Sequence, residues 1–120
     1  MIRSRGLNHI NLNVRNLDRS VAFYRKAFGL KVRFAAGRRM VFMGSPGAHD
    51  IVTLYKARKD EPIGNGGVSH FGFEMNGPIE KCIAQVERAG GKLLDRGEHA
   101  PGVPYAYLAD PDGYVIEIGN

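Results

Sequence analysis

Three residues of this chain combine metal-binding side chains with a regular placement. His9 and His70 each open a strand-like segment and lie 61 residues apart, and Glu117 lies in a strand-like segment near the C-terminus. Two imidazoles and one carboxylate, with open coordination positions, are the ligand set of non-haem Fe(II) oxygenases. The residues therefore predict a divalent-metal site. The alternative is structural, because a single strand histidine is more often an ordinary polar residue.

The 61-residue spacing belongs to an internal repeat. Residues 7–14 and 68–75 share the same alternation of polar and apolar side chains. We predict two β-α-β-β-β modules, over residues 1–59 and 68–120, with a linker at residues 60–67. The fold class is then α+β, with both modules in one domain that spans the whole chain. The modules should form a cup-like mixed sheet with the helices on its outer face.

Helical and strand periodicities locate the elements of each module. Helices are expected over residues 17–28, between a capping Asn16 and a terminating Gly29, and over residues 78–89, with Pro78 at the first helical position. Beyond the two histidine-bearing segments, strands are expected near 31–35, 39–43, 50–56, 92–95, 104–109 and 114–119.

Strand alternation places the candidate ligands on the polar side of the sheet. His9 and Asn11 share that side in the first strand, and Glu117 shares it in the last, since Ile116 and Ile118 face the helices. The pocket around the metal is then expected to include the four polar residues Asn11, Thr53, Tyr55 and Tyr105.

Composition narrows the class of protein. Residues 1–60 hold 13 Lys or Arg against 3 Asp or Glu, and residues 61–120 hold 4 against 9. This basic first half could favour an anionic substrate, although solvated surface charge is the simpler interpretation. We expect no nucleic-acid partner and no membrane span. The one cysteine, Cys82, lies among helix-facing apolar residues, and with no apolar N-terminal signal region it predicts a cytoplasmic protein.

Three sequence segments carry a resemblance to a known family. They are GLNHI at residues 6–10, NLDRSVAFY at residues 16–24 and LADPDGYVIE at residues 108–117. Together they resemble the vicinal-oxygen-chelate superfamily, which includes glyoxalase I, extradiol dioxygenases, fosfomycin-resistance transferases and bleomycin-resistance proteins. The resemblance implies the predicted fold, a homodimer, and a divalent metal, Fe(II) first and otherwise Mn, Ni or Zn.

The resemblance also ranks the possible reactions. Residues 97–117 are similar to the terminal signature of extradiol dioxygenases, which implies catalytic roles for His99 and Tyr107 and a small catechol-like substrate with adjacent oxygens. Family glyoxalases carry an additional Glu where this chain has Thr53, which weakens that assignment. Fosfomycin-type transferases carry a basic extension after the residue that matches Glu117, and the given sequence ends three residues later.

Two alternatives to the dioxygenase reaction stay open. The first is a glyoxalase-like lyase or isomerase, or a thiol transferase, using the same three ligands. The second, of less weight, is a non-catalytic binder of the bleomycin-resistance type. Such binders lack metal ligands and are typically acidic, whereas this chain has a net charge of +5.

Overall fold

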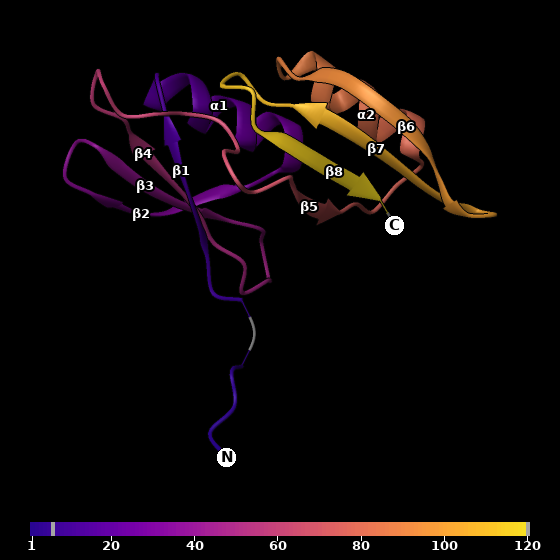
Figure 1. The fold of residues 1–120 in the computed structure, drawn as a ribbon, viewed down its shortest axis with the longest axis horizontal. Coiled ribbons are helices and arrows are strands. Elements are labelled where there is room, and N and C mark those ends of the chain that lie inside the picture. Colours follow the sequence, from indigo (N-terminus) through magenta and orange to yellow (C-terminus); the bar gives the residue numbers. More distant parts are fainter. Residues whose placement is uncertain (6, 120) are drawn as a thin grey trace.

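The structure is a computed structural model that describes residues 1–5 and 7–119. Two consecutive β-α-β-β-β modules make up the chain (Figure 1). The first module contains β1 (Ile10–Val14), α1 (Leu17–Phe28), β2 (Lys31–Ala36), β3 (Met40–Gly44) and β4 (Val52–Lys56). The second contains β5 (Phe71–Glu74), α2 (Ile79–Arg88), β6 (Lys92–Ala100), β7 (Val103–Ala109) and β8 (Val115–Gly119). The predicted fold class is therefore confirmed.

The strands form two mixed sheets of the same topology. Their orders are β1-β4-β3-β2 and β5-β8-β7-β6. In each sheet the first strand pairs in parallel with the last, and the remaining neighbours are antiparallel. Within the described residues β1 and β5 stay edge strands of separate sheets, so the predicted cup consists of two halves.

Helix α1 begins and ends where its sequence signals predicted. The Asn16 side chain accepts a hydrogen bond from the Arg19 amide at 3.0 Å, which satisfies one of the free N–H groups of the first turn. At the other end Gly29 adopts φ = 70°, a left-handed conformation that glycine reaches without strain.

Helix α2 differs slightly from the expected range of 78–89. Pro78 precedes the helix in an extended conformation, because the chain turns into the helix only after this residue. One side of α2 is apolar and buried, and it consists of Ile79, Cys82, Ile83 and Val86. Cys82 is thus a buried thiol whose pKa is raised by burial.

Strand β6 is longer than predicted and changes the setting of one candidate residue. The expected strand covered residues 92–95 and ended before His99. The structure continues the strand to Ala100, so His99 lies within β6. Two irregularities in the β6–β7 register accompany this extension, and they allow a long strand to curve.

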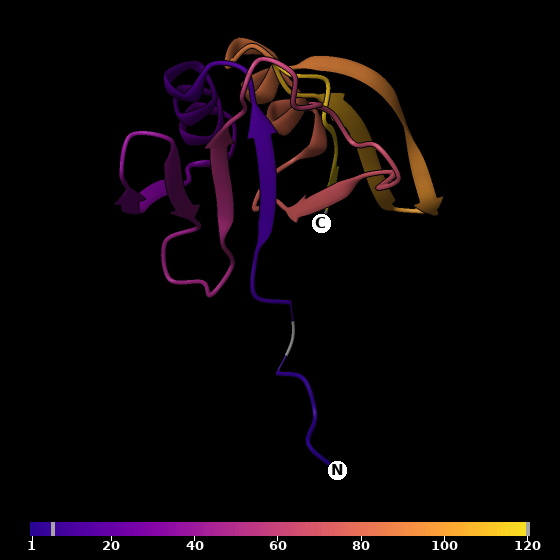
Figure 2. The ribbon, with the colours of Figure 1, turned by 60° about the vertical axis from the view of Figure 1, so that its left-hand side comes forward.

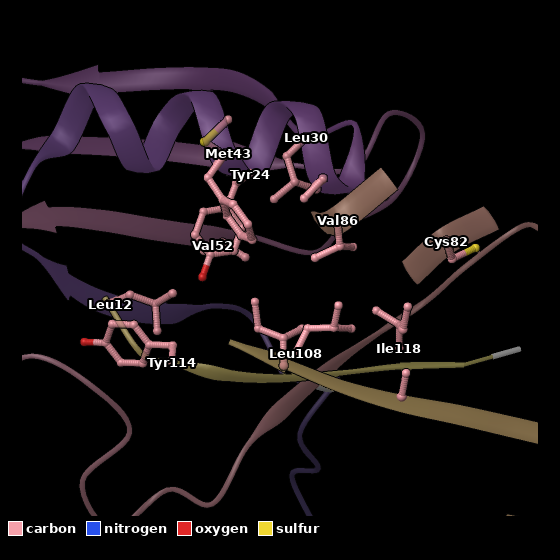
Figure 3. Packing of buried hydrophobic residues seen from close by; sticks show 14 of the residues in the cluster. Leu12, Tyr24, Leu30, Met43, Val52, Cys82, Val86, Leu108, Tyr114 and Ile118 are labelled. Carbon is pink, nitrogen blue, oxygen red and sulfur yellow. The ribbon is translucent and has the colours of Figure 1, made fainter. Parts of the chain in front are cut away.

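The helices of the two modules share one core. Both helices lie on the same side of the molecule in Figures 1 and 2 and contact each other. The rings of Phe28 and Phe73 stack with centroids 4.3 Å apart, and the Gln85 side-chain amide donates to the Ala27 carbonyl. Buried residues from both modules pack together between helices and sheets (Figure 3). The opposite faces of the two sheets are turned away from this core.

A polar contact fastens the second module onto α1. The buried Tyr24 hydroxyl donates to the Asp110 carboxylate at 2.7 Å, and burial raises the pKa of both groups. Asp112 accepts from Ser20 and from the Arg19 guanidinium. These residues belong to the two longest segments that carried the family resemblance, so much of that resemblance reflects contacts between modules. No helix in the described part of the chain is long and apolar enough to span a membrane.

Candidate metal centre

The helix-free face of the second sheet carries a cluster of polar side chains. Register places Glu117 of β8 between Gly72 of β5 and Tyr107 of β7. A cavity of about 490 Å³ opens on this face. Its lining consists of Gly72, Phe73, Glu74, His99, Val103, Pro104, Tyr105, Glu117 and Gly119.

Glu117 is the centre of the cluster. Its Oε2 lies 3.1 Å from Nε2 of His70, and its Oε1 lies 2.6 Å from Nε2 of His99. The hydrogen bond from His99 is the largest cause that lowers the pKa of Glu117 below its usual value, and the charge of His70 acts in the same direction. Glu117 is therefore an ionised carboxylate held from two sides by imidazoles.

Tyr107 completes the cluster. Its ring meets that of His70 edge-on, with centroids 4.9 Å apart, and its hydroxyl is a hydrogen-bond partner of Glu117. Burial and the neighbouring Glu117 carboxylate raise the pKa of Tyr107. The phenol therefore stays protonated at neutral pH and can donate a hydrogen bond.

His9 lies apart from this cluster. It precedes β1, its side chain is exposed, and Nδ1 contacts the Asn8 side chain at 2.8 Å. It lines a different cavity of about 350 Å³ between the modules, which also contacts Gly72 and Phe73. The two cavities are thus neighbours along β5, but the structure does not bring His9 into contact with Glu117.

No three His, Cys, Asp or Glu side chains in the described part of the chain are arranged to hold one metal ion. The geometry around Glu117 explains this result. His70 and His99 contact opposite oxygens, so the carboxylate lies between the two imidazoles and they do not converge on a shared point. The single chain supplies a pair of neighbouring donors, His70 and Glu117.

The predicted pocket residues divide between the modules. Tyr105 lines the Glu117 cavity. Asn11, Thr53 and Tyr55 lie on the first sheet, where Asn11 pairs with Thr53. Thr53 is 2% exposed, and its hydroxyl has no hydrogen-bond partner among residues 1–5 and 7–119. These three residues do not line the Glu117 cavity, so one chain assembles only part of the predicted pocket.

Several residues that line the cavity were not predicted from the sequence. Gly72 and Gly119 line it without a side chain, and a Cβ atom at Gly72 would lie 2.9 Å from the Glu117 carbonyl oxygen. Glu74, at the end of β5, contributes a second carboxylate. Strand parity could have identified Gly72 and Glu74, because they alternate on the same face as His70. Val103 and Pro104 carry no comparable signal.

The chain belongs to the glyoxalase/bleomycin resistance protein/dioxygenase superfamily. The family model matches residues 6–118, which is nearly the whole chain. Among solved structures, a glyoxalase/bleomycin resistance protein/dioxygenase family enzyme from Burkholderia phytofirmans has a TM-score of 0.77 at 18% identity. The alignment covers 94% of this chain and 96% of that one, which confirms the fold.

Two curated relatives carry names that describe activities. A lactoylglutathione lyase from Neisseria meningitidis is 30% identical over 92% of this chain and 87% of its own length. A trivalent organoarsenical cleaving enzyme from a Bacillus species is 33% identical over 88% of this chain and 66% of its own length. The relatives therefore include more than one reaction within the family.

Proposed function

We propose that this chain is a divalent-metal-dependent enzyme that cleaves the ring of a small catechol-like substrate in an extradiol reaction. The observation that carries the proposal is the cluster around Glu117, where a carboxylate, two imidazoles and a phenol meet beside one cavity. Three of its four residues, His99, Tyr107 and Glu117, lie in the segment 97–117 that resembles the extradiol signature. The fourth, His70, directly precedes β5, which pairs with the strand of Glu117.

The donors at this cluster suit the proposed metal. Imidazole nitrogen together with carboxylate oxygen binds Fe(II) well, and also Mn(II), Ni(II) and Zn(II). Glu117 has a lowered pKa and is ready to act as an anionic ligand, and His70 Nε2 lies beside it. When bound, Fe(II) would supply a Lewis-acidic and redox-active centre with open positions for substrate and dioxygen.

We assign His9 as the third protein ligand and a homodimer as the active form. His9 lines a cavity other than the Glu117 cavity within one chain, and β1 and β5 are edge strands in the described part of the chain, which a second copy can cover. Under this arrangement His9 of one subunit faces His70 and Glu117 of its partner.

Mixing two inactive variants tests the shared site. A heterodimer of His9→Ala and Glu117→Gln has both substitutions in one site and none in the other, so mixing should restore up to half of the wild-type metal binding per mixed dimer. If each site is built within one chain, the mixture binds no more metal than the separate variants do.

Proton handling falls to the chain's own residues. The Tyr107 hydroxyl, protonated at neutral pH, donates a hydrogen bond to a substrate oxygen or to the reacting dioxygen oxygen. Because His99 Nε2 donates its hydrogen to the Glu117 carboxylate, the other ring nitrogen, Nδ1, accepts a proton from the catechol and later returns it. Both oxygen atoms of dioxygen end in the ring-opened product, so the reaction needs no external reductant.

Oxygen uptake tests the reaction. Protein loaded anaerobically with Fe(II) should consume one dioxygen per catechol cleaved, and Glu117→Gln should abolish the uptake. If the loaded protein consumes no oxygen with any member of a catechol panel, the proposal is wrong. A protein that binds a ligand but no metal would instead be a binder of the bleomycin-resistance type.

A glutathione-linked lyase is the second candidate function, favoured by the lactoylglutathione lyase relative. Conversion of a glutathione hemithioacetal by the Ni(II)- or Zn(II)-loaded protein would establish it. The buried, uncharged Thr53 is the observation that ranks it second. Organoarsenical cleavage ranks lower, because trivalent arsenic prefers thiolates and the one cysteine is buried. That free buried thiol also supports our assignment to the cytoplasm.

A further inference from the structure

We propose that Tyr105 is a positioning residue that holds His99 in its hydrogen bond with Glu117, and that Gly97 makes room for it. This inference rests on the proposed function, in which His99 handles protons. In this role Tyr105 orients another side chain of the protein, whereas the sequence predicted it only as a residue of the substrate pocket.

The backbone alone does not fix the direction of the His99 side chain. In the β6–β7 register Glu98 pairs with Pro104 and Ala100 pairs with Val103, so His99 is the extra residue of a bulge. A bulged residue has no directly opposite partner on the neighbouring strand. The His99 side chain is also 54% exposed, so few core contacts restrain it.

The Tyr105 ring supplies the missing restraint. It stacks on the His99 imidazole with centroids 4.2 Å apart and an interplanar angle of 21°. Stacking restricts the imidazole to one plane, and the 2.6 Å contact from Nε2 to Glu117 Oε1 then fixes its rotation within that plane. Two independent contacts thus determine the orientation of His99.

Tyr105 is itself held by its neighbours. Its ring contacts that of Tyr107 with centroids 5.3 Å apart, and Tyr107 contacts His70 at 4.9 Å. The four rings therefore form a continuous series from His99 to His70 around the Glu117 carboxylate. Displacing Tyr105 would remove the ring contact that restrains the exposed His99 imidazole at the end of that series.

Gly97 pairs directly with Tyr105 and leaves the space that the ring occupies. A Cβ atom at this position would lie 2.9 Å from the Tyr105 hydroxyl oxygen and 3.1 and 3.2 Å from two ring carbons. Contacts below 3.4 Å require the neighbour to move. An alanine at position 97 would therefore force the end of the Tyr105 ring to shift, and the stacking of that ring on His99 would change with it.

The test begins with the metal-free protein, in which His99 ring signals are followed by NMR. In wild type the Tyr105 ring current should shift the His99 ring protons upfield, and Tyr105→Phe should keep that shift. Tyr105→Leu and Gly97→Ala should lose it. Phe34→Leu is the matched control, because it removes an exposed aromatic ring from the other module and should leave the His99 signals unchanged.

Turnover of the Fe(II)-loaded variants completes the test. Tyr105→Leu and Gly97→Ala should each lower kcat about tenfold at unchanged metal content, whereas Tyr105→Phe should stay within about twofold of wild type. Gly97→Ala should add no further loss in the Tyr105→Leu background, since both act through the same ring.

Several outcomes would overturn the inference. Unchanged His99 signals in Tyr105→Leu would show that the ring does not hold the imidazole. A rise in KM with unchanged kcat would make Tyr105 a substrate contact. Equal losses in Tyr105→Phe and Tyr105→Leu would assign the role to the hydroxyl. If no substrate is turned over by wild type, the proposed function fails, while the NMR comparison still decides the role of Tyr105.

Discussion

The two modules share one backbone plan and differ in what that plan carries. Asn11 and Gly72 are repeat-equivalent positions, 61 residues apart, and they pair with Thr53 and Glu117 respectively. Thr53 is therefore the structural counterpart of Glu117. Thr53 is buried and uncharged, and its hydroxyl has no partner in the described part of the chain, whereas Glu117 is an ionised carboxylate between two imidazoles.

The difference extends across the neighbouring strand. Phe42 pairs with Thr53 in the first sheet, and Tyr107 pairs with Glu117 in the second, so Phe42 and Tyr107 are at equivalent positions. Phe42 contacts Phe34 with ring centroids 5.6 Å apart, so the first module has an aromatic pair beside Thr53 where the second has titratable side chains beside Glu117. The repeat thus supplies the same backbone arrangement twice. Different side chains at equivalent positions place the titratable cluster in the second module.

The histidines show the same contrast. His9 and His70 both directly precede the first strand of a module, yet His70 contacts Glu117 while His9 contacts only the neighbouring Asn8 among the contacts found in the described residues. A carboxylate at the opposite strand accounts for the difference. We therefore expect substitutions at equivalent positions of the two modules to have very unequal effects.

The largest inequality should appear in metal affinity. Glu117→Gln keeps the shape of the side chain and removes its charge, so the affinity for a divalent metal should fall about 100-fold or more. Thr53→Val, at the equivalent position, should leave the affinity within about twofold of wild type. Calorimetric titration with Zn(II) measures both. Equal losses in the two variants would mean that the modules contribute alike.

Turnover should distinguish the two residues opposite these positions. Tyr107→Phe removes the hydroxyl that is a partner of Glu117, and kcat should fall about tenfold or more while the metal content stays intact. Phe42→Leu, the equivalent substitution in the first module, should retain full metal content and leave the NMR ring signals of His70 unchanged. Loss of metal in Tyr107→Phe would show that the tyrosine maintains the site rather than taking part in the reaction.

Stability should depend on the contact that joins the modules. Tyr24→Phe removes the donor to the buried Asp110 carboxylate and should lower the free energy of unfolding by about 1–3 kcal/mol at neutral pH. Tyr55→Phe, for which the described residues offer no comparable buried partner, should change the free energy of unfolding by less than about 0.5 kcal/mol. Denaturant unfolding followed by circular dichroism gives both values.

The deficit of Tyr24→Phe should also depend on pH. Burial raises the pKa of Asp110 in the folded protein, and the hydrogen bond from Tyr24 opposes that rise. A raised native pKa means that folding is favoured below the unfolded carboxyl pKa and loses stability as pH rises through the native value. Removing Tyr24 enlarges that loss, so the deficit should shrink in acid. A deficit that grows in acid would contradict this account.

A small effect on stability is also expected at Thr53. No residue that the structure describes is a hydrogen-bond partner of its buried hydroxyl, so Thr53→Val removes an unsatisfied polar group at nearly constant volume. The free energy of unfolding should stay within about 1 kcal/mol of wild type or rise. A loss of several kcal/mol would mean that the hydroxyl has a partner in solution.

Much of the fold could be predicted because its signals are local. Helix α1 was placed to the residue, since Asn16 and Gly29 mark its ends by side-chain chemistry and backbone conformation. The facing of Glu117 followed from strand alternation. Strand β6 was underestimated because its continuation past residue 95 depends on pairing with β7, which is a long-range contact that the local pattern does not contain.

The site was predicted less completely for the same reason. His70, His99, Tyr107 and Glu117 were all chosen from the sequence, and the structure brings them together. His9 lies in a different cavity because of how the two modules pack, and the residue types along the chain do not indicate that packing. The place of Gly97 was equally hidden, because a glycine needed for space resembles any other glycine in sequence.

Paramagnetic broadening by Mn(II) tests most directly the claim that the metal site lies on the helix-free face of the second module. Upon titration with Mn(II), the ring signals of His70 and His99 and the backbone amides of Gly72 and Gly119 should broaden first, in wild type but not in Glu117→Gln. If these signals stay sharp while others broaden, or if Glu117→Gln broadens in the same way as wild type, the metal lies elsewhere and the account is wrong.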